Sequence, residues 1–514
     1  MFASISLRVL LACTLFAFSL PAQDEAKLLV AFAKAFVPPP KGKATVADKL
    51  AALQATAELD SGKTAEVLVE GWNDLASELT TVDVLRDTKN KEMAELIRGQ
   101  EGSDNRTLPK PQFDRLLVLK PEIAALRMKG DQLRDLHEKV GERLAKLRRR
   151  DSALWLLQKV CGQKKLALPL KLAAAKAVGG AAVEVIEELA AALAKSREPE
   201  EQLVLIDAMA QAGKTAKAHA TPVIALLSSK EEAVAERAAL ALAKVAVPEA
   251  IGPMIALLAR IDGQTRLRVA AALEVLTGQQ FGITVTSWQA WWQAEADMFL
   301  AGGKPLGDGK PSNRRGNDNL YYFGIPQDES KSILYVIDCS GSMKAPVMWK
   351  SKEAVTETTR LEACKVELMR ALALLRPTQK FAILWYNDLP HFWEPKLQLA
   401  TKEAIEKAQA FVKTLTHASS TNIHDSLEQS FRLVGLGAND KYYGVQLDTI
   451  FLLTDGSPTT PDGKLDSTDK ILIGVRSWNP LKRVTIHCIA MGKDLNEGFL
   501  RQLASENGGE FKQF

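Results

Sequence analysis

Ile333-Leu334-Tyr335-Val336-Ile337 is a short, uninterrupted apolar run that leads directly into the polar stretch Asp338-Cys339-Ser340-Gly341-Ser342. Apolar runs of this length are typical of a strand buried on both faces of a parallel sheet. We therefore predict a strand over residues 333–337, with a polar turn at its carboxyl end. Ligands of open α/β sheets bind at that end of the strands, so this turn is the first candidate for a functional site.

The rest of the C-terminal part alternates between helical and strand-like patterns. The periodicity predicts helices over residues 361–375, 402–415, 425–434, 470–478 and 495–506. Strands are expected over residues 381–386, 391–399, 448–453 and 483–490, with a short edge strand over 510–514. Strands that alternate with helices form βαβ units, so we predict a doubly wound, mostly parallel α/β domain over residues 326–514.

Two further polar loops are predicted at the same edge of the sheet. Thr454-Asp455-Gly456-Ser457 follows a strand, and Ser419-Ser420-Thr421-Asn422 opens a helix. With the first turn they offer two carboxylates and three hydroxyls, from Asp338, Ser340, Ser342, Thr421 and Asp455. Such an all-oxygen shell suits Mg²⁺. Because three of the ligands are neutral, the ion stays electrophilic and has room for an outside oxygen, most naturally an Asp or Glu carboxylate of a protein partner.

Asp338-x-Ser340-x-Ser342, Thr421 and Thr454-Asp455-Gly456, in that order, resemble the metal-ion-dependent adhesion site (MIDAS) of von Willebrand factor type A domains. The resemblance covers residues 331–514. It implies that Ser340 and Ser342 ligate the ion directly and that Thr421 does so in the ligand-bound state. It implies that Asp338 and Asp455 act largely through water. It also implies Mg²⁺, or Mn²⁺ or Ca²⁺ in its place, and a role in adhesion or assembly.

Three features near this site leave alternatives open. Asp338 and Asp455 are also residue types that cap helices and form turns without any metal, although five matches in order favour the metal site. The long, charged insert of residues 343–359 departs from the family pattern, and it either shapes partner selection or is a plain surface loop. We expect Asp425 in the first turn of a helix and His424 on the rim of the site.

Residues 23–150 are predicted to be helical, with breaks at Pro38-Pro39-Pro40 and around residues 102–111. Apolar residues spaced by three and four form one stripe of the last helix, namely Leu133, Leu136, Val140, Leu144 and Leu147. The stripe is too short for a coiled coil, so we expect this helix to pack within its own region.

Residues 151–300 are rich in alanine, leucine and valine, and paired helical patterns repeat along them at a regular interval. One such pair cannot bury its apolar face alone, so the pairs must stack into an α-solenoid that resembles HEAT-type repeats. Trp288, Trp291 and Trp292 are predicted to be an aromatic cap on its open end rather than a ligand platform. Residues 301–325 have the Gly-, Pro- and Asn-rich composition of a flexible linker.

Residues 1–22 have the layout of a secretory signal peptide: Arg8, an apolar run over residues 9–20, then Pro21-Ala22. The run is too short to span a bilayer, so we expect an exported protein, either periplasmic, extracellular or at the cell surface. A buried N-terminal helix of a cytoplasmic protein is the alternative.

No CxxC pair is present, so zinc and thioredoxin-type chemistry are not indicated. Whether any disulfide forms is left open.

The composition excludes several classes of function. The 514 residues include 66 Lys and Arg against 62 Asp and Glu, and a net charge of +4 is too weak to indicate a nucleic-acid partner. The sequence has no HExxH, GxxxxGK[ST] or GxSxG motif. We therefore predict a non-catalytic protein that captures an acidic group of a protein partner through Mg²⁺. The alternatives are a scaffold whose solenoid binds partners while the metal only stabilises loops, and a cytoplasmic assembly factor that works with an ATPase.

Overall fold

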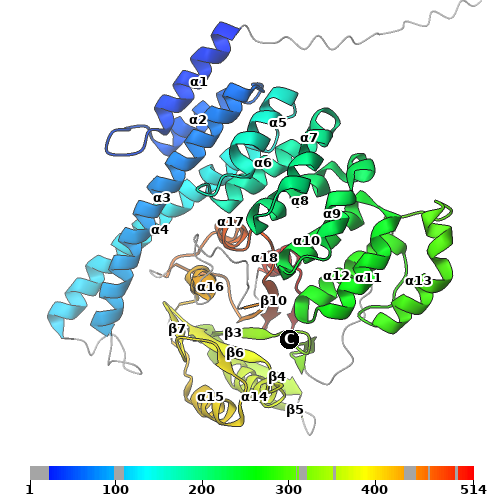
Figure 1. Cartoon of the computed structure of the whole chain (residues 1–514). Helices are drawn as coiled ribbons and strands as arrows, with labels where there is room; N and C mark the ends of the chain where they lie inside the picture. The colour runs from blue at the N-terminus through cyan, green and yellow to red at the C-terminus, as the bar shows by residue number, and fades with distance from the viewer. Residues whose placement is uncertain are drawn as a thin grey trace, which may run out of the picture.

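The computed structural model describes residues 22–97, 109–307, 309–311, 321–350, 355–418, 420–432, 447–460, 463–492 and 496–514. An all-helical region comes first, and a mixed, mostly parallel α/β domain follows it (Figure 1). The predicted fold class is therefore confirmed. Residues 1–21 and 312–320 lie outside the described residues, so the signal peptide and the middle of the linker stay predictions.

The helical region begins with α1 (Ala22–Phe36), α2 (Val46–Ala55), α3 (Gly62–Ile97) and α4 (Lys110–Leu144). Helices α3 and α4 are 36 and 35 residues long and lie side by side as a hairpin (Figure 1). The predicted apolar stripe is buried along α4 and just beyond its end. The stripe packs within the helical region, as predicted, while other residues of α4 contact the α/β domain.

The following helices form a curved stack of pairs. Their bounds are α5 (Arg150–Leu156), α6 (Leu168–Gly180), α7 (Ala182–Lys195), α8 (Pro199–Ala212), α9 (Thr221–Leu226), α10 (Glu232–Val245), α11 (Ile251–Arg260), α12 (Gly263–Thr277) and α13 (Val285–Leu300). Small residues let neighbours approach closely: a Cβ on Gly179 of α6 would lie 2.3 Å from the Ala208 carbonyl oxygen of α8. The stack is an α-solenoid in form, and its assignment to HEAT repeats stays a prediction.

Helix α13 closes the end of this stack with aromatic side chains. Trp288 is fully buried, and its indole nitrogen donates to the Gly282 carbonyl oxygen at 2.8 Å. Trp291 and Trp292 are half-buried and pack against Phe299. Because α13 also lies against α11, the predicted aromatic cap is confirmed.

The α/β domain is built on a sheet with the strand order β11-β10-β9-β3-β6-β7. The parallel strands are β3 (Ser332–Asp338), β6 (Lys380–Tyr386), β9 (Thr449–Thr454), β10 (Thr485–Ala490) and β11 (Phe511–Gln513). The two central strands, β3 and β9, are buried along their whole length, as their apolar runs predicted. The edge strand predicted at the C-terminus is β11.

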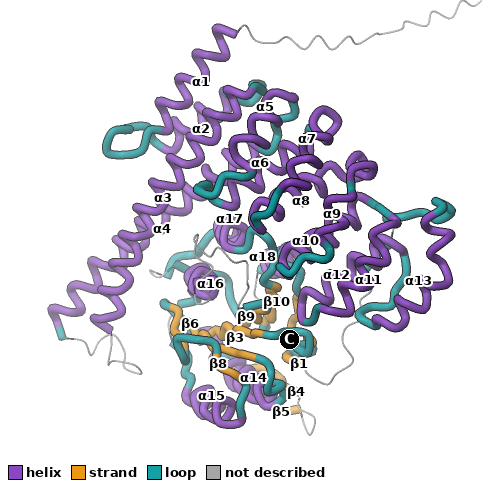
Figure 2. Tube along the Cα trace, in the orientation of Figure 1, coloured by secondary structure: helices purple, strands orange, loops and turns teal. Residues whose placement is uncertain are grey.

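Helices cover both faces of the sheet (Figure 2). Helices α14 (Arg360–Ala373) and α15 (Lys402–Thr414) pack on the face that carries Tyr335. Helices α16 (Ile423–Arg432), α17 (Thr468–Trp478) and α18 (Glu497–Glu506) pack on the face that carries Val336. Alternate residues of β3 therefore contribute to two separate cores, which is the arrangement of a doubly wound fold.

Two of the predicted local structures are different in the structure. The strand expected over residues 391–399 is split into β7 (Pro390–Phe392) and β8 (Gln398–Leu399), both antiparallel to β6. A turn of only three residues joins β6 to β7, and so short a connection forces an antiparallel pair. The insert of residues 343–359 contains an antiparallel hairpin of β4 (Pro346–Lys350) and β5 (Val355–Thr359) rather than a plain loop.

The four cysteines of the described residues form no disulfide. Cys161, Cys339, Cys364 and Cys488 are all buried free thiols. Among the described residues, no helix combines the length and the apolar character that crossing a membrane requires.

The helical region curves over the α16, α17 and α18 side of the α/β domain (Figure 1). Ion pairs bridge the two regions along this contact: Arg86–Glu428, Asp87–Arg432, Glu138–Arg476, Glu236–Arg483 and Asp262–Lys331. The Arg86 pair is the most buried of these, since its two side chains are 3% and 6% exposed. The two regions are therefore joined by specific charged contacts and not only by the linker.

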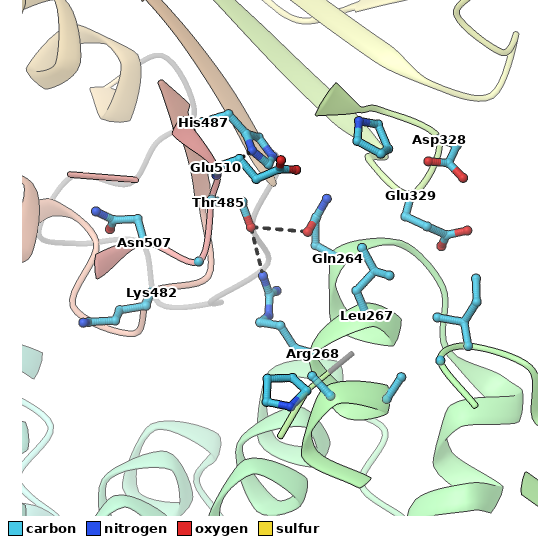
Figure 3. Close-up of a pocket in the computed structure, with 18 of the residues that line it drawn as sticks. Gln264, Leu267, Arg268, Asp328, Glu329, Lys482, Thr485, His487, Asn507 and Glu510 are labelled. Atoms are coloured by element: carbon cyan, nitrogen blue, oxygen red, sulfur yellow. Dashed lines mark hydrogen bonds between the residues drawn. The ribbon is translucent and has the colours of Figure 1, made fainter. Parts of the chain in front are cut away.

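A cleft of about 430 Å³ lies where α12 meets the amino end of β10 (Figure 3). There the Thr485 hydroxyl donates to Gln264 Oε1 at 3.3 Å and accepts from Arg268 Nη1 at 3.4 Å. The lining mixes acidic and basic side chains, including Glu329 and Lys482, so it selects no single ligand charge. This contact holds the sheet at the end opposite to the polar loops predicted from the sequence.

Acidification is expected to weaken the contact made by Glu428. Burial alone would raise the pKa of this carboxyl, but the guanidinium groups of Arg86, Arg432 and Arg134 outweigh it and lower the pKa from 4.5 to about 2. Because the folded-state pKa is the lower one, ionised Glu428 stabilises the fold above pH 4.5, and this contribution is lost as the pH falls toward 2. Urea denaturation at pH 7, 4 and 3 measures the free energy of unfolding. Between pH 7 and pH 3 this free energy should fall by about 2–3 kcal/mol more in wild type than in Glu428→Gln. Parallel pH profiles of the two proteins would contradict this expectation.

Candidate metal centre

The polar residues predicted to bind a cation lie at the carboxyl edge of the two central strands. Asp338 is the last residue of β3, and Asp455 directly follows β9, its neighbour in the sheet. Ser340 and Ser342 lie in the turn after β3, and Thr421 precedes α16. Parallel strands end at a common edge, which is why residues more than a hundred positions apart meet here.

Asp338 organises the first loop from a fully buried position. Its Oδ1 accepts from the Ser340 backbone N–H at 2.8 Å. Its Oδ2 accepts from the Thr454 hydroxyl at 2.8 Å and from the Tyr386 hydroxyl at 3.3 Å. This one carboxylate on β3 therefore accepts from donors on β6, on β9 and in the turn, which holds the turn that carries the serine hydroxyls.

The first and third loops are in direct contact. The Ser342 hydroxyl donates to Asp455 Oδ1 at 2.6 Å, and the hydroxyl oxygens of Ser340 and Ser342 are 3.0 Å apart. The other oxygen of Asp455 accepts from Arg360 Nη1 at 2.9 Å. Ser342 is thus within hydrogen-bond distance of two other predicted metal ligands, Ser340 and Asp455.

Thr421 reaches the same place from the second loop. A Cβ built on Gly456 would lie 3.7 Å from Ser342 Oγ and 3.7 Å from Thr421 Oγ1, so both hydroxyls border one point beside Gly456. Thr421 is fixed by a reciprocal pair of 2.8 Å hydrogen bonds with Thr459, from its N–H to the Thr459 hydroxyl and from the Thr459 N–H to its carbonyl. The structure therefore brings all five predicted residues to one edge of the sheet, and ion binding by them stays a prediction.

The chemistry of this donor set fits a small divalent cation. Its side chains offer only carboxylate and hydroxyl oxygens, which Mg²⁺ and Mn²⁺ accept. Burial and the nearby Asp455 carboxylate raise the pKa of Asp338 to about 6, so a cation placed here relieves the repulsion of two buried negative charges. Burial also raises the pKa of the Cys339 thiol, which lies in the apolar core, so no thiolate competes for the site.

Arg360 is a residue of this site that the sequence reasoning missed. It is the first residue of α14, and its side chain is 16% exposed. It contacts the Asp455 side chain, which is fully buried. A cation in the first turn of a helix opposes the helix dipole, so an arginine at this position is a sequence signal of a local negative partner. Its guanidinium holds one oxygen of Asp455 and leaves the other to Ser342.

The expectation for His424 is wrong, and that for Asp425 is confirmed. Asp425 lies in the first turn of α16, but His424 is fully buried rather than on a rim. Its ring contacts Asp425 at 3.0 Å and Asp131 of α4 at 3.7 Å, because the helical region covers it. His424, Asp425 and Glu428 come close enough to hold a metal, yet the cation Arg86 already binds Glu428 there. We interpret this cluster as structural.

The insert hairpin is anchored beside the site by aromatic contacts. Trp349 of β4 packs against Phe323 and Phe514, with ring centroids 5.5 and 6.0 Å apart. Its neighbour Met348 is 63% exposed. The hairpin is thus a fixed element with an apolar side chain in solvent, and whether it selects partners stays open.

Comparison with known proteins identifies the C-terminal third. Residues 331–512 match the family model of the von Willebrand factor type A domain. Inter-alpha-trypsin inhibitor heavy chain H4 of Homo sapiens is 27% identical over 180 residues, which cover 35% of this chain and 18% of that protein. Heavy chain H1 of Mesocricetus auratus is 28% identical over 198 residues, which cover 38% and 20%. The chain thus spans about a fifth of the length of these relatives.

Solved structures are similar over about a third of the chain. A von Willebrand factor type A protein from Catenulispora acidiphila matches with a TM-score of 0.29 and 20% identity, covering 36% of this chain and 38% of that one. Proximal thread matrix protein 1 from the mussel byssus, in a structure with a zinc-occupied MIDAS motif, matches with a TM-score of 0.25 and 17% identity, covering 35% and 41%.

Proposed function

We propose that this protein is an exported, non-catalytic binding protein that captures an acidic group of a protein partner through a divalent cation. The observation that carries the proposal is the convergence of three loops, with Ser342 Oγ 2.6 Å from Asp455 Oδ1 and the Thr421 hydroxyl beside them. The match of residues 331–512 to the von Willebrand factor type A family supports it.

The proposed roles follow from how each side chain is held. Ser340, Ser342 and Thr421 present hydroxyl oxygens to the ion, and Asp338 and Asp455 supply its negative charge largely through water. A bound Mg²⁺ would supply an electrophilic centre with one coordination position for a partner's carboxylate. Arg360 keeps Asp455 in place when a partner's carboxylate enters or leaves this coordination position.

Catalysis is not part of the proposal because neither carboxylate is placed as a proton donor or base. Asp338 is an acceptor for Ser340, Thr454 and Tyr386. Asp455 is engaged by Ser342 and Arg360. A cation between them keeps both groups ionised, which is the wrong state for a general acid.

Removal of one hydroxyl tests the proposal directly. Isothermal titration of the metal-free full chain with Mg²⁺ should show binding by wild type, and Ser342→Ala should weaken it at least tenfold. Ser457→Ala is the matched control, because Ser457 is an exposed serine two residues after Asp455 and is outside the donor set. Equal affinities of wild type and Ser342→Ala, or no binding by wild type, would overturn the assignment of the site.

Partner capture distinguishes binding from scaffolding. A pull-down from the extracytoplasmic fraction should retain a partner in Mg²⁺, lose it in EDTA, and lose it with Ser342→Ala. If EDTA lowers only the melting temperature and the same partner is retained, the scaffold alternative is correct. A chain found in the cytosol with its N-terminus uncleaved would instead favour the assembly factor that works with an ATPase.

A further inference from the structure

Helix α4 of the helical region reaches the loop that carries Thr421. The hairpin of α3 and α4 runs past α16, and α4 lies against α17 (Figure 1). Besides α17, it contacts the loops around Thr421, through Arg127 and through Lys120. None of its residues belongs to the donor set of the metal centre, so its contribution to the site is indirect.

Arg127 is the main contact of α4 with these loops. It is only 2% exposed. Its Nη1 donates to Asn422 Oδ1 at 3.4 Å, and its Nη2 makes a short ion pair with Asp466. Asn422 is the residue after Thr421, and the Asp466 N–H donates to the Pro458 carbonyl, next to the Thr459 that pairs with Thr421. One guanidinium therefore joins both segments that flank Thr421.

Lys120 is linked to the same loop through Asp388, in the turn between β6 and β7. It lies seven residues before Arg127, two helical turns along one face of α4. Its ammonium is 3.7 Å from Asp388 Oδ2, while Asp388 Oδ1 accepts from the Ser420 N–H at 2.9 Å. Leu389, the next residue, packs against the apolar cluster of Met93, Leu116, Leu119 and Ile123 in the hairpin.

We propose that α4 is a second layer of the metal centre, in which Arg127 and Lys120 are positioning residues that hold the Thr421 loop in its cation-binding geometry. The affinity of the α/β domain for a divalent cation then depends on the helical region. This inference rests on the donor set of the proposed function and adds a regulation that the donor set alone does not contain.

The direction of the effect follows from preorganisation. The Thr421 hydroxyl already faces the Ser342 hydroxyl across Gly456, so the clamp by α4 holds a geometry that favours binding. A ligand loop that is fixed in advance has less conformational freedom to lose when the ion binds. By linkage, an ion bound at Thr421 must stabilise the contact of α4 with the loop by the same factor.

Two arginine variants of the full chain test the proposal. Arg127→Met should weaken Mg²⁺ binding roughly 5- to 100-fold in isothermal titration, the usual range of coupling between sites. Arg143→Met is the matched control, because Arg143 lies on the same helix and donates to carbonyls of Thr56 and Leu59 within the helical region. The control should lower the melting temperature in EDTA without changing Mg²⁺ affinity. Equal affinities of Arg127→Met and wild type would overturn the inference.

A milder variant and a second readout keep the test informative if Arg127→Met folds poorly. Lys120→Met removes the partly buried ion pair with Asp388 and should weaken Mg²⁺ binding about two- to threefold. In wild type, Mg²⁺ should slow amide exchange in α4 near Arg127 but not near Arg143. Unchanged exchange in α4 on saturation with Mg²⁺ would refute the coupling while leaving the metal site intact. Absence of Mg²⁺ binding by wild type would instead refute the proposed function.

Discussion

Replacement of Arg86 with methionine is expected to lower the free energy of unfolding by about 3 kcal/mol, because it breaks a buried ion pair and leaves the Glu428 carboxylate with the partly exposed Arg432. Arg86 of α3 donates from one nitrogen to both carboxylate oxygens of Glu428 in α16, at 2.7 Å each. The two residues belong to different regions of the chain. The loss should therefore appear in the transition that separates the helical region from the α/β domain.

Denaturant titration of the full chain measures this effect. The double variant Arg86→Met with Glu428→Gln should recover part of the loss, because the uncompensated charge is removed with its partner. Lys89→Met is the control on the same helix, since its pair with Glu122 is 28% and 41% exposed and should contribute less than about 1 kcal/mol. An Arg86→Met loss no larger than that of the control would show that the interface is held by apolar contacts instead.

Asp338→Asn should raise stability in the absence of a divalent cation and should abolish the stabilisation that the cation provides. In EDTA at pH 8 the variant should be about 1–3 kcal/mol more stable than wild type, because burial and Asp455 disfavour the ionised Asp338 that this pH requires. An amide nitrogen in place of Oδ2 can donate to the hydroxyls of Thr454 and Tyr386, which accept as well as donate, and it gives up the long 3.4 Å hydrogen bond from the Asp455 N–H. Mg²⁺ should stabilise wild type by about 2.7 kcal/mol at a hundred times its dissociation constant and should leave the variant unchanged.

Thermal melting of both proteins in EDTA and in Mg²⁺ gives the four values needed. Asp469→Asn is a suitable control, since Asp469 lies in the first turn of α17 outside the donor set. A variant less stable than wild type in EDTA would mean that the carboxylate of Asp338 is needed for its hydrogen bonds rather than for a cation. That result would favour the alternative in which Asp338 is a turn former.

The sheet and its polar edge could be predicted because their signals are local. The apolar run of β3 and the turn after it are adjacent in sequence, and strand ends meet wherever strands are parallel. The strand predicted over residues 391–399 is present only at the two ends of this range, as β7 and β8, and the three-residue turn before β7 makes its pairing with β6 antiparallel. The hairpin in the insert was not predicted because its charged residues mask the pairing of β4 with β5.

The contact between the two regions could not be predicted from such signals. Arg127 and its partner Asp466 are 339 positions apart, and no periodicity relates them. One signal was available: Arg127 continues the buried stripe of Leu116, Leu119 and Ile123, where an apolar residue is expected. A charged residue in such a stripe indicates a buried partner elsewhere in the chain, but it does not say where.

The bridging ion pairs also limit how the chain can be divided for experiments. A fragment of residues 326–514 would lack Arg86 and Arg127. The carboxylates of Glu428 and Asp425 would then lose the positive charges that compensate them in the full chain. The two regions are thus better regarded as parts of one folding unit than as independent domains. Experiments on the metal centre should therefore use a chain that includes the helical region.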